Sequence, residues 1–318
     1  MGSATSHAER DRSWVGKPWE PPSSHPDGRV DRIQRWRGWQ LLASFALLIA
    51  AQVMGIAPYY ALKGIRPDDP LLAATVFLLS AVVAAAVSVG GHALIVKHLG
   101  GRPGTGLAGP GKLREFGAGL GMGFALMTFM FAVLWILGVY RVHDIGWNPG
   151  IVSGLAIGIA AGFNEEVFFR GNLLRILDDW IGSWGALAVT ALFFGVAHIF
   201  NPGASLFTSL ALVLEAGILL GATYLLTRRL WLVIGLHIAW NTTMASLFGG
   251  VVSGATNEGG LLTSSLEGPQ WLTGGAMGVE GSVVAIAVAG LLGLVILVLA
   301  VRKGRMLPPT WYHGAARE

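Results

Sequence analysis

Residues 71–95 read LLAATVFLLSAVVAAAVSVGGHALI, a continuous run without any Asp, Glu, Lys or Arg. A helix of this length would cross the roughly 30 Å hydrocarbon core of a bilayer, because each residue adds about 1.5 Å. The chain of 318 residues has the same character, since 53% of its residues are hydrophobic and only 13% are charged, with a mean hydropathy of +0.60. These values predict an all-α fold class, a polytopic bundle of transmembrane helices.

Eight segments are apolar and long enough to be predicted spans. They cover about 40–62, 71–95, 116–139, 152–177, 184–200, 205–226, 230–248 and 282–301. Residues 1–37 are polar and rich in Pro, Ser, Arg and Trp, which predicts a disordered cytosolic tail. The transmembrane domain is expected over 38–304, and 305–318 form a second short cytosolic tail.

The basic residues predict the orientation of these spans. With eight spans, most Lys and Arg residues fall on one side, and the other side holds only Lys63, Arg66 and Arg141. The positive-inside rule therefore predicts that both termini are cytosolic in a cell membrane, expected to be a bacterial plasma membrane. The expected partner of this surface is the lipid bilayer. No basic stripe with interleaved aromatic residues is present, so no nucleic-acid binding is expected.

Three polar clusters interrupt the apolar segments. Ionised groups at the centre of a membrane helix cost roughly 2.5–3.5 kcal/mol each on an insertion scale, so they are functional candidates by default. Within each cluster, key residues are four positions apart and share one helix face. The clusters are Glu165, Glu166 and Arg170; Phe194 and His198, followed by Asn201; and His237 and Asn241.

The clusters are expected to meet at one depth. A turn is predicted at 178–183, with Gly182 as the helix breaker. Glu166 and His198 are equally far from Gly182 along the chain, about 24 Å on each helix. His237 and Asn241 lie well inside the segment 230–248, so one polar intramembrane cavity is predicted.

Two chemistries fit such a cavity. A carboxylate and a neutral imidazole can deprotonate a water, while a second imidazole and an amide donate hydrogen bonds to an oxyanion. Alternatively, Glu165, His198 and His237 could hold a zinc ion with an open position for water. The chain has no Cys, so a thiolate site is excluded, and the cofactor stays open between a divalent metal and none.

The two adjacent glutamates cannot point the same way, since they are about 100° apart around a helix. Glu166 shares a face with Arg170 and could pair with it. We therefore predict Glu165 as the water-activating carboxylate and Glu166 as its supporter, with the reverse assignment left open.

Other polar residues of the spans have plainer interpretations. Glu215 is a partner of the cavity or a contact within the bundle, and His92 is expected at the membrane interface. Arg175, Asp178 and Asp179 are expected to be solvated at the turn.

The three clusters resemble the motifs of the CAAX protease and bacteriocin-processing family, also called the type II CAAX prenyl endopeptidase or Abi family. That family carries EExxxR, FxxxH and HxxxN on successive membrane helices. This chain reads EEVFFR at 165–170, FGVAH at 194–198 and HIAWN at 237–241, and the resemblance covers about 162–242.

The resemblance implies a helical bundle whose polar cavity opens toward the cytosol and the lipid, and it implies peptide-bond hydrolysis. Glu165 and His198 would activate the water, His237 and Asn241 would stabilise the oxyanion, and Glu166, Arg170 and Phe194 would support them. The family's motifs do not settle whether the reaction uses a metal or a glutamate alone.

We therefore predict an intramembrane endopeptidase whose substrate is a peptide or a membrane-anchored protein, possibly prenylated. The alternatives are a non-catalytic membrane scaffold or immunity protein, and a proton-coupled transporter that uses Glu, His and Arg as a relay. The oligomeric state and the roles of the tail and the loop 249–281 have no signal in the sequence.

Overall fold

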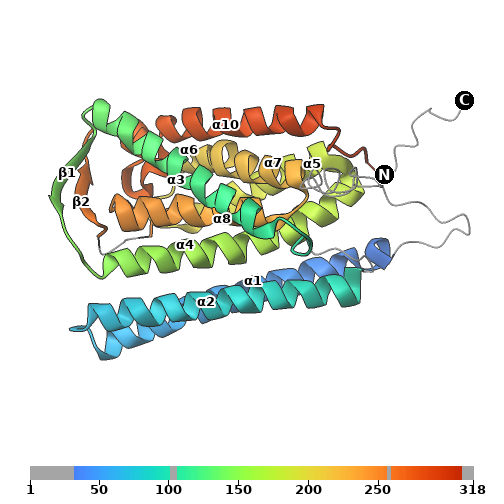
Figure 1. Cartoon of the computed structure of the whole chain (residues 1–318), viewed down its shortest axis with the longest axis horizontal. Coiled ribbons are helices and arrows are strands. Elements are labelled where there is room, and N and C mark those ends of the chain that lie inside the picture. Colours follow the sequence, from blue (N-terminus) through green and yellow to red (C-terminus); the bar gives the residue numbers. More distant parts are fainter. Residues whose placement is uncertain (1–31, 101–105, 256–258, 310–318) are drawn as a thin grey trace, which may run out of the picture.

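The computed structural model describes residues 32–100, 106–255 and 259–309, and these form a bundle of long helices (Figure 1). Seven helical stretches of the described residues are long and apolar enough to cross a membrane. They are Trp36–Ile65, Pro70–Gly100, Lys112–Ile136, Gly150–Phe200, Leu206–Thr227, Leu230–Leu247 and Val283–Arg302. The predicted polytopic helical bundle is therefore confirmed, and the protein is a multi-pass membrane protein.

The elements follow one another with few long connections. The α-helices are α1 (Arg32–Ile65), α2 (Pro70–Ile95), α3 (Lys112–Ile136), α4 (Gly150–Glu166), α5 (Arg175–Ala197), α6 (Leu206–Leu212), α7 (Ile218–Thr227), α8 (Leu230–Thr242), α9 (Gln270–Thr273) and α10 (Val283–Arg302). Wider π-helical turns extend four of the spans, at Val96–Gly100, Val167–Leu174, Val213–Gly217 and Thr243–Leu247. Short 3₁₀ turns lie at His198–Phe200, Gly275–Met277 and Val279–Gly281.

The longest helical stretch, Gly150–Phe200, reverses its direction at Gly182. Gly182 has φ 78° and ψ 166°, which breaks the helix there. The ring centroids of Phe169 and Phe194 are only 5.0 Å apart, whereas a straight helix would separate these residues by roughly 37 Å. The stretch therefore holds two of the eight predicted segments, 152–177 and 184–200, and the predicted turn is confirmed.

Helix α8 lies at the centre of the bundle, packed between α3 and α4. Small residues allow this, because a Cβ atom at Gly119 or Gly123 of α3 would overlap the backbone carbonyl oxygen of Leu232 or Leu236. On the other side of α8, a Cβ at Gly158 of α4 would overlap the hydroxyl of Thr242 and the carbonyl oxygen of Ile238. Such close approach of helix backbones is typical of transmembrane packing.

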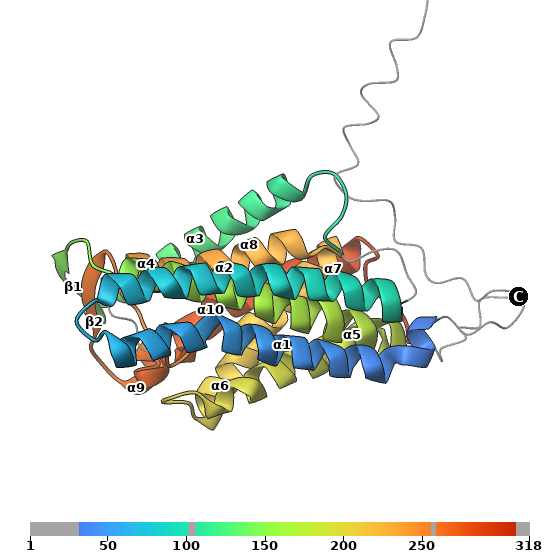
Figure 2. The ribbon, with the colours of Figure 1, turned by 90° about the horizontal axis from the view of Figure 1, so that it is seen from below.

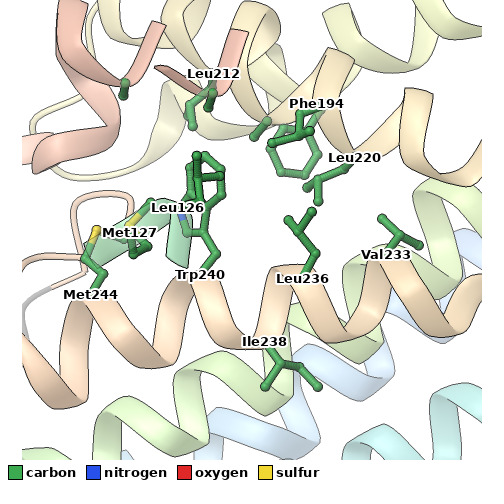
Figure 3. Close-up of a cluster of buried hydrophobic side chains, with 14 of the residues drawn as sticks. Leu126, Met127, Phe194, Leu212, Leu220, Val233, Leu236, Ile238, Trp240 and Met244 are labelled. Atoms are coloured by element: carbon green, nitrogen blue, oxygen red, sulfur yellow. The ribbon is translucent and has the colours of Figure 1, made fainter. Parts of the chain in front are cut away.

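Apolar side chains pack on opposite sides of α8. Figure 3 shows Leu236 and Trp240 pointing toward Phe194 and Leu212, while Ile238 points to the opposite side of the helix. These five side chains are almost completely buried. The helix that carries the third polar motif is therefore held rigidly by its surroundings.

Helices α1 and α2 form a layer beside α4 (Figures 1 and 2). A buried polar chain joins this layer to the bundle. The Ser88 hydroxyl donates to Oδ1 of Asn164 at 2.7 Å, and Nδ2 of Asn164 donates to Oε1 of Gln52 at 3.1 Å. Helix α1 begins at Arg32, so residues 32–37 are helical although the sequence predicted a disordered tail there; the rest of that predicted tail, 1–31, lies outside the described residues.

The two ends of the bundle differ in charge and structure. The C-terminal end of α10 and the N-terminal ends of α3 and α8 lie at one end, which carries most of the basic residues, as the charge pattern predicted (Figure 1). At the other end, β1 (Tyr140–Ile145) pairs antiparallel with β2 (Leu262–Leu266). This small sheet was not predicted from the sequence, because its strands lie in connections that carry no strong apolar alternation.

Candidate active site

The first motif lies where α4 widens into the π-helical turn Val167–Leu174. This turn leaves backbone carbonyls without the usual i, i+4 partner, and Nδ2 of Asn172 donates to the carbonyl of Val167 at 2.9 Å. π-helical turns inside helices are frequent at functional sites. Here the turn carries Arg170 inward, where only 2% of its surface is exposed.

Glu166 contacts the side chains of both Arg170 and His237 inside the protein. Its side chain is completely buried, and Oε1 accepts from Nη1 of Arg170 at 2.8 Å and from Nδ1 of His237 at 2.7 Å. Arg170 also donates to the carbonyls of Ala216 and Gly217. The predicted pairing of Glu166 with Arg170 is confirmed, and the structure adds a direct link from Glu166 to the third motif.

Phe194 packs between the charged and imidazole groups of the site. Its ring lies 4.6 Å from the ring of His198 and 6.4 Å from that of His237, and the guanidinium of Arg170 lies 5.0 Å over its face. An arginine over an aromatic face is attracted by the ring quadrupole. The Phe of the second motif therefore fixes the positions of three polar neighbours.

The tautomer of His198 follows from its backbone contact. Nδ1 lies 2.7 Å from the carbonyl oxygen of Phe194, and because a carbonyl oxygen only accepts, Nδ1 must carry a proton. In the neutral ring Nε2 then has a lone pair that can accept a proton or a hydrogen bond.

Glu165 points into a cavity of ≈ 230 Å³ that also receives the side chains of the other two motifs. His198, His237 and Asn241 line the same cavity. Oε2 of Glu165 and Oδ1 of Asn241 are buried and have no hydrogen-bond partner in the described part of the chain. The predicted convergence of the three motifs in one cavity is thus observed, with two polar groups available to a ligand.

A CAAX protease family match covers these residues. The model of the family described as type II CAAX prenyl endopeptidase Rce1-like matches residues 145–243. This segment is similar to the CAAX protease family. Comparisons with curated proteins and with solved structures gave no match. The resemblance of the motifs is thereby confirmed for the matched third of the chain, and it supports a CAAX-type intramembrane protease in general terms.

The zinc alternative depends on how closely the three candidate ligands approach one another. Within the described ranges, no three His, Cys, Asp or Glu side chains are grouped closely enough to hold a metal ion. Glu165, His198 and His237 share the cavity without forming a ligand cluster, while each imidazole uses Nδ1 on a protein group and keeps Nε2 as the ring nitrogen for a ligand. In this arrangement the three candidate side chains are not grouped as zinc ligands.

The loop 249–281, which lies beyond the matched family segment, closes one wall of the cavity. Glu280 is 3% exposed; its Oε1 accepts from Nε1 of Trp240 at 2.8 Å, and its Oε2 accepts from the backbone N–H and the hydroxyl of Ser253 at 2.6 and 2.7 Å. Nδ2 of Asn201 donates to the carbonyl of Ser253 at 2.8 Å. Glu280 was missed by the sequence analysis, because a single acid in a connection carries no spacing signal.

Three other polar groups differ from their predicted surroundings. His92, expected at the interface, is fully buried, and its Nδ1 lies 3.1 Å from Oδ1 of Asn172. Asp178 and Asp179, expected to be solvated, are buried, and Asp178 forms an ion pair with Arg228. The turn at Gly182 packs against Leu307 and Pro309 in the chain after α10, and this packing helps to bury the two acids.

Glu215, for which a cavity partner or a bundle contact was considered, is completely buried in the π-helical turn Val213–Gly217. Neither carboxylate oxygen has a hydrogen-bond partner in the described structure. It does not line the cavity, so a direct role beside Glu165 has no support.

Proposed function

We propose that this protein is an intramembrane endopeptidase that hydrolyses a peptide bond of a membrane-associated protein or peptide. The observation that carries this proposal is the convergence of Glu165, His198, His237 and Asn241 on one cavity. The family match of residues 145–243 supports the same class of reaction. The location in a cell membrane, predicted from the basic residues, is part of this proposal.

The reaction begins with a water held between Glu165 and His198. The carboxylate of Glu165 accepts one proton of the water, while Nε2 of His198 accepts a hydrogen bond from the other. The water oxygen then bonds to the carbonyl carbon of the substrate. Nδ1 of His198 donates to the carbonyl of Phe194, so Nε2, on the opposite side of the ring, points away from the backbone of its own helix.

The oxyanion that forms is stabilised by Asn241 and His237. The amide of Asn241 donates one hydrogen bond, and Nε2 of His237 donates another when both ring nitrogens carry protons. Glu166 then balances the charge of the imidazolium through Nδ1. Glu165 finally returns its proton to the leaving amine as the C–N bond breaks, which yields an amine and a carboxylic acid that loses its remaining proton to solvent.

The test exposes the purified full chain to a diverse peptide library that includes prenylated members, and mass spectrometry identifies the new termini. The expected result is a set of new termini with the wild type that Glu165→Ala lacks, although both proteins show the same unfolding temperature. Identical profiles from two well-folded samples would favour the scaffold or the proton-coupled transporter. Proton flux in reconstituted vesicles would then distinguish these two alternatives.

A further inference from the structure

A second cavity lies at the basic end of the bundle, away from the proposed active site. It measures ≈ 320 Å³ and is formed by the start of α3, the end of α7, the start of α8 and the chain that follows α10. Figure 2 shows the N-terminal end of α3 diverging from the other helices. We call this cavity the basic cleft.

Three cations line the basic cleft without a partner of opposite charge. Within the described structure, the side chains of Arg114, Lys303 and Arg305 form no hydrogen bond or ion pair, and Nε of Arg305 is buried without an acceptor. The single acid of the lining, Glu115, has its Oε1 3.0 Å from Nη1 of Arg229, so its charge is already countered. The cleft therefore has an excess of positive charge, and its N–H donors lack acceptor oxygens.

Most of the remaining lining is apolar, and its one other polar side chain, Thr227, donates its hydroxyl to backbone carbonyls. Ala118, Leu226 and Leu232 form the wall next to the cations. Leu113, at the start of α3, is 80% exposed. The cleft lies at the ends of spanning helices, where the headgroups of a bilayer are expected. A cation cluster beside an apolar wall suits a ligand that has an anionic group joined to an acyl chain.

We propose that the basic cleft binds an anionic phospholipid, with the phosphate between Arg114, Lys303 and Arg305 and the acyl chain against Leu226 and Leu232. Arginine matches phosphate oxygens with several N–H donors at once. Basic pockets between membrane helices bind anionic headgroups for the same reason. The site does not depend on the proposed peptidase activity.

The test measures binding of dihexanoyl phosphatidylglycerol to the purified full chain in a nonionic detergent, by native mass spectrometry. Dihexanoyl phosphatidylcholine and inorganic phosphate are the comparison ligands. We expect phosphatidylglycerol to bind roughly tenfold or more tightly than either. Equal binding of the two lipids would overturn the charge argument, and equal binding of inorganic phosphate would overturn the lipid argument; neither measurement needs a variant.

A pair of double variants separates the cleft from general attraction to the basic end. Arg114→Gln/Lys303→Gln removes two cations of the lining, and Lys112→Gln/Arg302→Gln removes two exposed cations on the same helix ends that do not line the cleft. The first pair should weaken phosphatidylglycerol binding roughly tenfold or more, and the second by less than about threefold. Equal weakening by both pairs would overturn the proposal, and unfolding temperatures verify that both variants are folded.

Discussion

At the scale of single residues, the two adjacent glutamates of the first motif have different surroundings. Glu166 is completely buried between Arg170 and His237, whereas Glu165 reaches the cavity. Helix geometry alone predicted this separation, because neighbours point about 100° apart and Arg170 lies four residues after Glu166. The link from Glu166 to His237 was not predictable, since it depends on how α4 and α8 pack.

Glu166→Gln should destabilise the protein strongly. The change leaves Arg170 buried without its counter-ion, which costs roughly 3–5 kcal/mol. The measurement is the unfolding temperature in detergent, compared with Glu165→Gln, which should change it little because Glu165 reaches the cavity. The double variant Glu166→Gln/Arg170→Met should recover much of the lost stability. An unchanged unfolding temperature for Glu166→Gln would show that the buried ion pair does not stabilise the fold.

At the scale of elements, the glycines of α3 determine how closely this helix approaches α8. A Cβ at Gly119 would overlap the carbonyl oxygen of Leu232 and lie 2.8 Å from the backbone nitrogen of Leu236, while a Cβ at Gly121 would meet nothing within 4 Å. Composition had predicted only that many of the 46 glycines serve helix packing. Which glycines do so depends on the rotation of each helix, which the sequence alone does not give.

Gly119→Ala should therefore lower stability by roughly 1–3 kcal/mol, because α3 must move away from α8. Gly121→Ala is the matched control and should be neutral or slightly stabilising, since alanine favours the helix. Thermal unfolding of both variants in the same detergent tests this. Equal effects of the two substitutions would contradict the packing of α3 on α8.

The loop 249–281 is a second element whose position matters to the site. Glu280 connects it to Trp240 of α8, directly beside Asn241. The contact of Glu280 with Trp240 and the pairing of β1 with β2 were not predicted. Each contact connects two segments that are far apart in the sequence and carry no motif.

Glu280→Ala should loosen this wall of the cavity. Three hydrogen bonds to a buried carboxylate are lost, so amide hydrogen exchange over 251–255 should become roughly tenfold faster or more. Glu267→Ala is the control, because Glu267 is exposed just after β2 and, among the described residues, its carboxylate contacts only the exposed Arg141 and the hydroxyl of Ser265. Unchanged exchange over 251–255 in Glu280→Ala would mean that other contacts hold the loop.

At the scale of the whole molecule, the basic residues and the cavity lie toward opposite ends. The lining of the cavity includes Asn201, Ser253 and Ala255, which belong to the connection between α5 and α6 and to the connection that leads to β2. The positive-inside rule predicts that the end of the bundle that carries β1 and β2 faces away from the cytosol. The resemblance to the family implies instead a cavity that opens toward the cytosol, so the orientation decides from which side a substrate enters.

Cysteine labelling resolves the orientation, because the natural chain has no cysteine. Lys112→Cys places a thiol at the basic end, and Thr263→Cys places one on exposed β2. With a membrane-impermeant maleimide on intact bacterial cells, Thr263→Cys should be labelled, and Lys112→Cys only after permeabilisation. The reverse pattern would contradict the predicted topology and place β1 and β2 in the cytosol.

The central claim is that Glu165 activates the water for peptide-bond hydrolysis. The most direct measurement is the initial rate at which wild type and Glu165→Gln cleave a peptide identified from the library, at equal amounts of folded protein. Glutamine keeps the shape of the side chain but cannot accept the proton, so the rate should fall by roughly 10²–10⁴-fold with an unchanged unfolding temperature. A Glu165→Gln protein that cleaves within a few-fold of the wild-type rate would contradict the assignment.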